Sequence, residues 1–112
     1  MIETRIFEAA LAIQSPWYVK EIQFDAASKR LDIYIDFNRG STFPSTDPTF
    51  PDKYKVKDTL DKTWRHLNFF EHECYINCRT PRIDLGGNKT ELISPPWAGV
   101  VSGFTLLFEA LV

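Results

Sequence analysis

An alternation of apolar and polar side chains runs through Leu31-Asp32-Ile33-Tyr34-Ile35-Asp36-Phe37. A shorter alternation precedes it, in which Ile22 and Phe24 are separated and flanked by polar residues. The polar stretch 25–29 lies between the two. Side chains of a strand point to opposite faces in turn, so a period of two indicates a strand with one buried face. The two stretches therefore predict an antiparallel β-hairpin.

The segment before this hairpin has helical spacing. Apolar side chains recur there at intervals of three and four residues, at Ile6, Ala9, Ala10 and Ile13. Pro16 follows, and proline disfavours the α conformation at the residue before it. We therefore expect a short amphipathic helix over Arg5–Ile13.

A proline-rich stretch follows the hairpin at Arg39–Asp52. Pro44, Pro48 and Pro51 fall within eight residues, and proline has no N–H to donate to a sheet. Such a segment is unsuited to a central strand or a helix interior, so we expect a loop. Loops of this length in small domains are usually functional, the remains of a site, or poorly ordered.

The second half of the chain predicts further strands. Two short strands are expected over 53–58 and 63–67, around a turn at 59–62. A longer strand is expected over Phe69–Arg79, and Pro81 is expected to end its pairing.

The last part of the chain changes character. Gly86-Gly87-Asn88 predicts a turn, and Thr90–Ile93 a last short strand. After Ser102-Gly103, the segment Phe104–Val112 has apolar residues almost all round and predicts the first turns of a helix. Such a helix belongs in an interior. We therefore expect a fragment of a longer polypeptide, or an end that packs against a partner or a second copy.

These elements together predict a small α+β fold in a single domain spanning residues 1–112. It consists of a mostly antiparallel β-sheet of four or five strands, an N-terminal helix and a truncated C-terminal helix. The expected core is formed by Trp17, Ile22, Phe24, Leu31, Ile33, Ile35, Phe37, Trp64, Phe69, Cys74, Ile76 and Cys78.

Composition excludes several classes of protein. The chain has 112 residues, 44% of them hydrophobic and 14% aromatic, which is too many for a disordered chain. No apolar stretch reaches the roughly 18 residues of a transmembrane helix. No secretory signal is recognisable, so a cytoplasmic location is expected. The net charge of −2 does not favour a polyanionic partner.

The sequence offers little support for an enzyme, a metal site or a cofactor. Cys74 and Cys78 would lie about 13 Å apart on a strand, too far for a disulfide or a shared zinc ion. They are better interpreted as buried, reduced side chains. His66 and His72 add no recognisable ligand spacing. No nucleophile–base pair or glycine-rich phosphate loop can be identified.

One segment is more basic than the rest of the chain. Residues 53–82 contain seven basic and four acidic side chains, a local charge of +3, with five aromatic residues interleaved. Basic groups neutralise phosphates and aromatic rings stack on bases, so the segment is compatible with nucleic-acid binding. The alternative is that the aromatic rings are core and the lysines protect strand edges.

Several strings carry a resemblance to a known family, and two of them, 64–70 and 103–109, are long enough to be specific. The strings are Pro16-Trp17-Tyr18-Val19, Arg30-Leu31-Asp32-Ile33-Tyr34-Ile35-Asp36-Phe37, Thr63-Trp64-Arg65-His66-Leu67-Asn68-Phe69-Phe70, Pro81-Arg82, Pro96-Trp97-Ala98 and Ser102-Gly103-Phe104-Thr105-Leu106-Leu107-Phe108-Glu109. In this order and spacing they closely resemble the amino-terminal zinc-finger region of bacterial insertion-sequence transposases of the ISL-three type. The resemblance extends from about Leu11 onward. It implies a metal-stapled, DNA-binding domain.

In that family a helix-turn-helix segment and a catalytic core follow the zinc-finger region. Neither follows in this sequence, so strand transfer by this chain alone is not expected. The family also carries two pairs of zinc ligands. The matching positions here hold Ser45, Pro48, Leu85 and Asn88, none of which offers the sulfur or imidazole nitrogen that zinc prefers. We therefore expect no bound zinc, with stability supplied by apolar burial.

The resulting hypothesis is a transposase-derived, non-catalytic DNA-binding domain. Its phosphate contacts are predicted at Lys57, Arg65, Arg79 and Arg82, with His66 as a further polar contact. The alternative hypothesis is a protein-interaction or oligomerisation module that uses Phe104–Val112. An unselected remnant without a function is a third interpretation.

Overall fold

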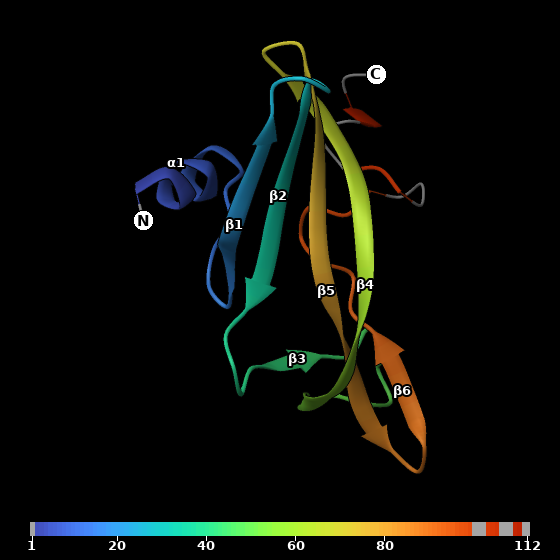
Figure 1. Cartoon of the computed structure of the whole chain (residues 1–112). Helices are drawn as coiled ribbons and strands as arrows, with labels where there is room; N and C mark the ends of the chain where they lie inside the picture. The colour runs from blue at the N-terminus through green and yellow to red at the C-terminus, as the bar shows by residue number, and fades with distance from the viewer. Residues whose placement is uncertain (1, 100–102, 106–108, 111–112) are drawn as a thin grey trace.

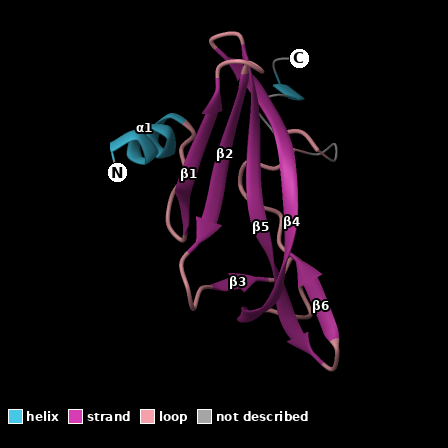
Figure 2. Cartoon of the chain, viewed as in Figure 1, coloured by secondary structure: helices cyan, strands magenta, loops and turns pink. Residues whose placement is uncertain are grey.

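The computed structural model describes residues 2–99, 103–105 and 109–110. Strands predominate, with one short helix at the N-terminal side (Figure 2). In order the elements are α1 (Ile2–Ala10), β1 (Trp17–Asp25), β2 (Arg30–Phe37), β3 (Thr42–Pro44), β4 (Lys53–Phe69), β5 (His72–Gly86) and β6 (Lys89–Leu92). This mostly β architecture with an N-terminal helix fits the expected small α+β fold in part.

The described strands form one sheet in the order β1-β2-β5-β4-β3, with β6 pairing to β5 (Figure 1). Strands β2 and β5 run parallel, and the other pairings are antiparallel. Antiparallel β4 and β5 form a long ribbon that extends past the lower ends of β1 and β2 in Figure 1. Strand β1 forms one edge of this sheet.

The predicted hairpin is confirmed as β1 and β2. Ile22 lies opposite Ile33, and Phe24 opposite Leu31. The turn is fixed by Asp25, whose side-chain oxygen accepts hydrogen bonds from two backbone N–H groups, those of Ala27 and Ser28. The alternating stretch therefore pairs as its period of two predicts.

The prediction for the second half of the chain needs correction. The expected turn at 59–62 lies inside the continuous strand β4, and β5 continues through Pro81 to Gly86. Pro81 is tolerated because its carbonyl accepts a 2.9 Å hydrogen bond from the N–H of Ile93. The backbone of Pro81 therefore faces Ile93 rather than β4, and β4 loses no partner.

Two other expected elements have different bounds. The expected loop 39–52 contains the short edge strand β3, where Pro44 is compatible with its edge position. The helix spans Ile2–Ala10 rather than Arg5–Ile13, because Ala12 has a left-handed φ of 56°. The predicted turn at 86–88 and the short strand after it are confirmed as the β5–β6 connection.

The core lies along one face of the central strands. It includes nine of the twelve expected residues, together with Val19, Phe43, Ile83, Leu85 and Trp97. Phe24 and Phe69 are not core: they are 54% and 40% exposed, whereas Leu31, directly opposite Phe24, is fully buried. Phe24 and Phe69 lie near strand ends, where alternation places them on the apolar face but little of the described chain covers them. Ile22 is half-buried.

Trp97 anchors the C-terminal part of the chain to this core. Its ring lies edge-on to those of Trp17 and Trp64, at centroid distances of 5.1 and 5.6 Å. Phe104 and Thr105 form isolated bridges with Arg65 and Ala98. Glu109 and Ala110 are helical, and the N–H of Glu109 donates a 3.1 Å hydrogen bond to the carbonyl of Thr105, so one turn of the expected helix is described. The expected helical residues at 106–108 and 111–112 lie outside the described residues. No C-terminal helix of the expected extent is shown, and the proposed interface at Phe104–Val112 stays a prediction.

No helix within the described ranges is long and apolar enough to cross a membrane.

Candidate nucleic-acid interface

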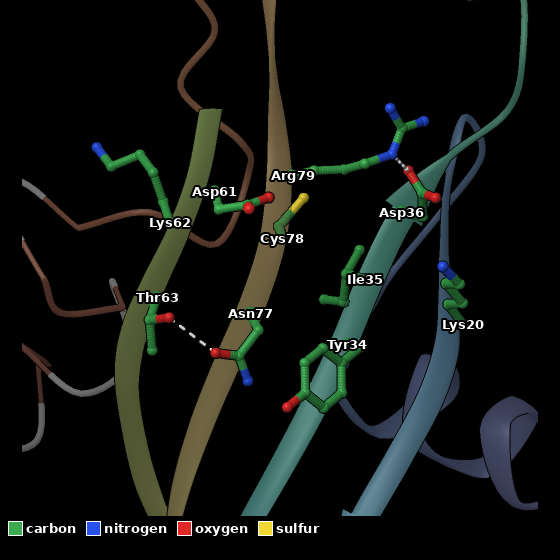
Figure 3. A pocket seen from close by; sticks show the side chains of 10 residues that line it. All are labelled: Lys20, Tyr34, Ile35, Asp36, Asp61, Lys62, Thr63, Asn77, Cys78 and Arg79. Carbon is green, nitrogen blue, oxygen red and sulfur yellow. Dashed lines mark hydrogen bonds and ion pairs between the residues drawn. The ribbon is translucent and has the colours of Figure 1, made fainter. Parts of the chain in front are cut away.

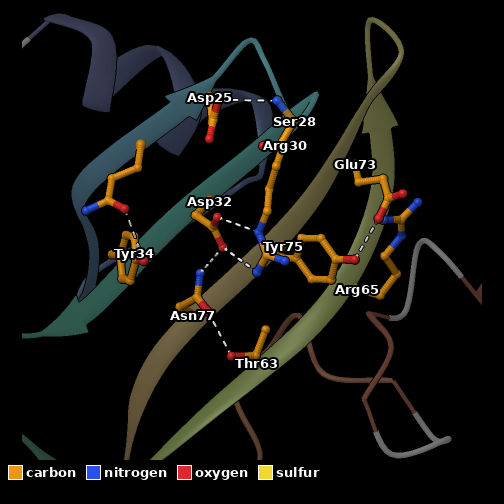
Figure 4. A network of polar contacts seen from close by, with 11 residues as sticks. Asp25, Ser28, Arg30, Asp32, Tyr34, Thr63, Arg65, Glu73, Tyr75 and Asn77 are labelled. Atoms are coloured by element: carbon orange, nitrogen blue, oxygen red, sulfur yellow. Dashed lines mark hydrogen bonds and ion pairs between the residues drawn. The ribbon is translucent and has the colours of Figure 1, made fainter.

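The face of the sheet opposite the core carries a connected polar network (Figure 4). Arg30 makes a bidentate contact with Asp32, at 2.7 and 3.1 Å. Asp32 also accepts a 3.0 Å hydrogen bond from the amide of Asn77, whose oxygen in turn accepts one of 2.7 Å from Thr63. The network spans β2, β5 and β4, so three strands contribute to one polar surface.

Arg65 and Tyr75 lie at the end of this surface that is nearest to the turn between β4 and β5. The Arg65 guanidinium donates to Glu73 at 2.9 Å and to Asn68 at 2.6 Å. The Tyr75 ring has the guanidinium of Arg30 at 3.9 Å from its centroid and that of Arg65 at 5.2 Å. Hydrogen bonding by Tyr75 and the nearby charge of Arg65 lower the pKa of Glu73. The charge of Arg65 is thus balanced by a neighbouring carboxylate.

Arg79 lies further along the same face, beside a cleft of about 330 Å³ (Figure 3). Its guanidinium forms a 3.0 Å ion pair with Asp36 on β2. The cleft is also lined by Lys20 and Asp61. Lys20, Lys62 and Arg79 face Asp36 and Asp61 in this lining, so its positive and negative charges nearly balance.

Lys57 and Arg82 lie at the other end of the ribbon. Arg82 makes a bidentate pair with Asp58, at 2.7 and 2.5 Å. Hydrogen bonding by Arg82 lowers the pKa of Asp58 and raises that of Arg82. Lys57 is exposed at the irregularity between Val56 and Asp58.

Lys57 is the last of three exposed lysines at alternate positions of β4. We call Lys53, Lys55 and Lys57 the lysine row. None of the three makes an ion pair with a carboxylate in the described part of the chain. Lysines without an ion-pair partner attract a polyanion more strongly than arginines already paired with acids.

His66 lies apart from the other predicted residues. It pairs with Cys74, a residue of the buried face, and its Nδ1 lies 2.7 Å from the Thr105 hydroxyl. Burial lowers the pKa of the imidazole. A neutral, half-buried imidazole is suited to holding Thr105 in place and gives no positive charge to a phosphate.

The structure thus divides the five predicted residues into three groups. Arg65 and Arg79 share the polar face, Lys57 and Arg82 lie together at the far end, and His66 is on the core side. Sequence reasoning missed Arg30, which follows the hairpin turn directly. The alternation of Leu31–Phe37 extends back to this residue and places it on the polar face.

The four positions that match zinc ligands in the resembled family do not fit a metal. Leu85 is a buried hydrocarbon side chain, and Pro48 has no donor atom. The Ser45 hydroxyl donates to Glu91, and Asn88 lies in the β5–β6 turn with a left-handed φ of 65°. Among the described residues, no group of three or more His, Cys, Asp or Glu side chains is placed to hold a metal ion.

Both cysteines are buried and free, as expected from their alternate positions on β5. Burial raises the pKa of Cys74 to about 11 and that of Cys78 to about 12. Thiols with such values stay protonated at neutral pH and are poor nucleophiles and metal ligands. The two side chains act as small apolar groups in the core.

Comparison with known proteins gives no match: no family model, curated protein or solved structure is similar to this chain. The assignment to a transposase zinc-finger family therefore stays a prediction.

Proposed function

We propose that this chain is a non-catalytic DNA-binding domain derived from an insertion-sequence transposase. The proposal rests on the resemblance of its sequence strings to that family and on one structural observation. That observation is the lysine row of β4, which is exposed and makes no ion pair with the described acidic side chains. The lysine row would neutralise phosphates of the DNA backbone.

Arg82 extends the lysine row on the neighbouring strand. Its pair with Asp58 is at the surface, with about 45% of the Arg82 side chain exposed. Exposed ion pairs contribute only about 0–1 kcal/mol, so a phosphate can compete for the guanidinium. Arg65 and Arg79 would act in the same way on the polar face, where each must exchange a carboxylate partner for a phosphate.

Binding of this kind positions a protein on DNA without reading its sequence. We therefore expect weak affinity for any duplex and a strong dependence on salt. Each phosphate contact contributes about 0.9 to the slope of log K against log salt concentration.

The test is a salt titration of a fluorescently labelled 20-base-pair duplex, followed by anisotropy. The triple variant Lys53→Gln, Lys55→Gln, Lys57→Gln should lose affinity, and its salt slope should fall by about 2 to 3. The matched control is Arg5→Gln, Lys20→Gln, Lys29→Gln, which removes the same charge elsewhere. Equal effects of the two triples, or no binding at 50 mM salt, would contradict the proposal.

A further inference from the structure

Strand β1 is an edge strand whose outer side is largely unpaired. Its inner side pairs with β2, and the N–H of Val19 on its outer side donates a 2.8 Å hydrogen bond to the Glu8 carboxylate of α1. From Lys20 to Asp25, no described strand or loop pairs with the outer edge. A row of unpaired backbone groups is a template for one more strand.

The opposite edge of the sheet, formed by β4, is paired at two places. Strand β3 pairs with the start of β4, and the backbone N–H and carbonyl of Arg65 are both bonded to the segment 103–105. Between Lys55 and Arg65 no described strand pairs with the outer edge of β4, so what distinguishes the free edge of β1 is the apolar groove beside it.

An apolar groove lies beside this edge. It has a volume of about 640 Å³ and is bounded by Phe7 of α1, by Ile22 and Phe24 of β1, and by Phe69 of β4. In Figure 1 helix α1 lies on the outer side of β1, beside this edge. Ile6 on α1 and Phe70 beside Phe69 are 59% and 83% exposed.

Charges on the polar side of β1 indicate which charges the side chains of a further strand would carry. Glu21, Gln23 and Asp25 are exposed there, and Lys20 lies at the bulge. Antiparallel self-pairing that places Ile22 opposite the Phe24 of a second copy would also place Glu21 opposite its Asp25. Like charges directly opposite each other are unfavourable, which argues against a second copy in this register, the one that pairs the two apolar side chains of β1 with each other.

We propose that β1 and α1 form a docking groove for an extended peptide segment of a partner protein, in which apolar and basic residues alternate. The segment adds to β1 as a further strand. Its apolar side chains pack between Phe24 and α1, and its basic side chains lie opposite Glu21 and Asp25.

The probe is an octapeptide of alternating valine and lysine with blocked ends and a fluorophore, titrated with the full chain. Two control peptides alternate valine with glutamate, or place four valines before four lysines. The alternating valine–lysine peptide should bind at least tenfold more tightly than either control. Equal binding of the peptide with separated blocks would overturn the proposal, because only alternation matches a strand.

Two variants, each with a matched control variant, locate the binding. Phe24→Ala should weaken binding tenfold or more, whereas Leu60→Ala should change it less than twofold. Leu60 is a matched control because it is similarly exposed, at 51%, and lies outside the groove. Glu21→Lys should reverse the preference toward the valine–glutamate peptide, while Asp52→Lys should leave it unchanged.

Sedimentation tests whether a second copy of the chain, rather than a peptide, occupies the groove. The full chain should remain monomeric at the concentrations used for peptide binding. A dimer that Phe24→Ala dissociates would assign the groove to a second copy and overturn the proposal, as would equal effects of Phe24→Ala and Leu60→Ala.

Discussion

The Ser45 hydroxyl donates a 2.6 Å hydrogen bond to the Glu91 carboxylate, joining residues 46 positions apart in the sequence. The same carboxylate accepts two bonds of 3.0 Å from the N–H and hydroxyl of Thr46. Lys89 lies 3.7 Å from Asp47 in the same region. These contacts hold the proline-rich segment against β6.

Glu91 is therefore expected to stabilise this end of the sheet. Glu91→Ala removes the acceptor of three hydrogen bonds and should lower the free energy of unfolding by about 1–3 kcal/mol. Glu21→Ala, at an exposed edge position, should change it by less than about 0.5 kcal/mol. Urea unfolding of the two variants checks this expectation, and equal values would show that the Glu91 contacts contribute little.

The contribution of Glu91 should also depend on pH. Hydrogen bonding by Ser45 and Thr46 lowers its pKa below the ordinary 4.5. The folded state thus favours the carboxylate, and this stabilisation is lost as pH falls through the folded-state pKa. The difference in the free energy of unfolding between the chain and its Glu91→Ala variant should therefore shrink at acidic pH.

The absence of zinc ligands predicts that stability does not depend on a metal. A zinc chelator at pH 7 should leave the melting temperature unchanged.

The stability of the fold should also depend on pH near neutrality, because of His66. Burial lowers its pKa from the ordinary 6.5, so below this value the unfolded chain binds more protons than the folded one. Stability should therefore fall as pH decreases from 7.5 to 5.5, by at most about 1.4 kcal/mol per pH unit. His66→Gln should remove this dependence, and His72→Gln should retain it. Thermal melts across this range provide the measurement.

Two aromatic residues should differ sharply in their effect on stability. Trp97→Ala removes a buried ring that contacts Trp17 and Trp64, and should cost about 3–5 kcal/mol. Phe24→Ala at a half-exposed edge position should cost less than about 1 kcal/mol. Denaturant unfolding measures both, and a large loss for Phe24→Ala would show that this ring is part of the core.

Prediction from the sequence succeeded where the alternation of apolar and polar side chains within one segment was enough to define a strand and its buried face. The alternation around Leu31–Phe37 predicted the hairpin and its buried face. It failed at Pro81, because local rules treat proline as the end of pairing, whereas the proline carbonyl here faces Ile93 across the sheet. The core prediction likewise could not separate Phe24 from Leu31, since alternation defines the face of a strand and not its distance from the sheet edge.

The candidate site shows the same limit. Counting charges found the basic segment, but only the pairing of strands shows that Arg65, Arg79 and Arg82 each have a carboxylate partner on another strand or across the sheet. Asp36 and Arg79 are 43 residues apart, so no local pattern predicts their contact.

By itself, the sequence determined the strands of the hairpin, the N-terminal helix and the burial of both cysteines, because side-chain periodicity is a local property of the backbone. Tertiary structure decided the parallel pairing of β2 with β5, the neutralisation of the arginines and the open edge of β1. These features depend on which distant segments meet, and that is set by the packing of the whole sheet.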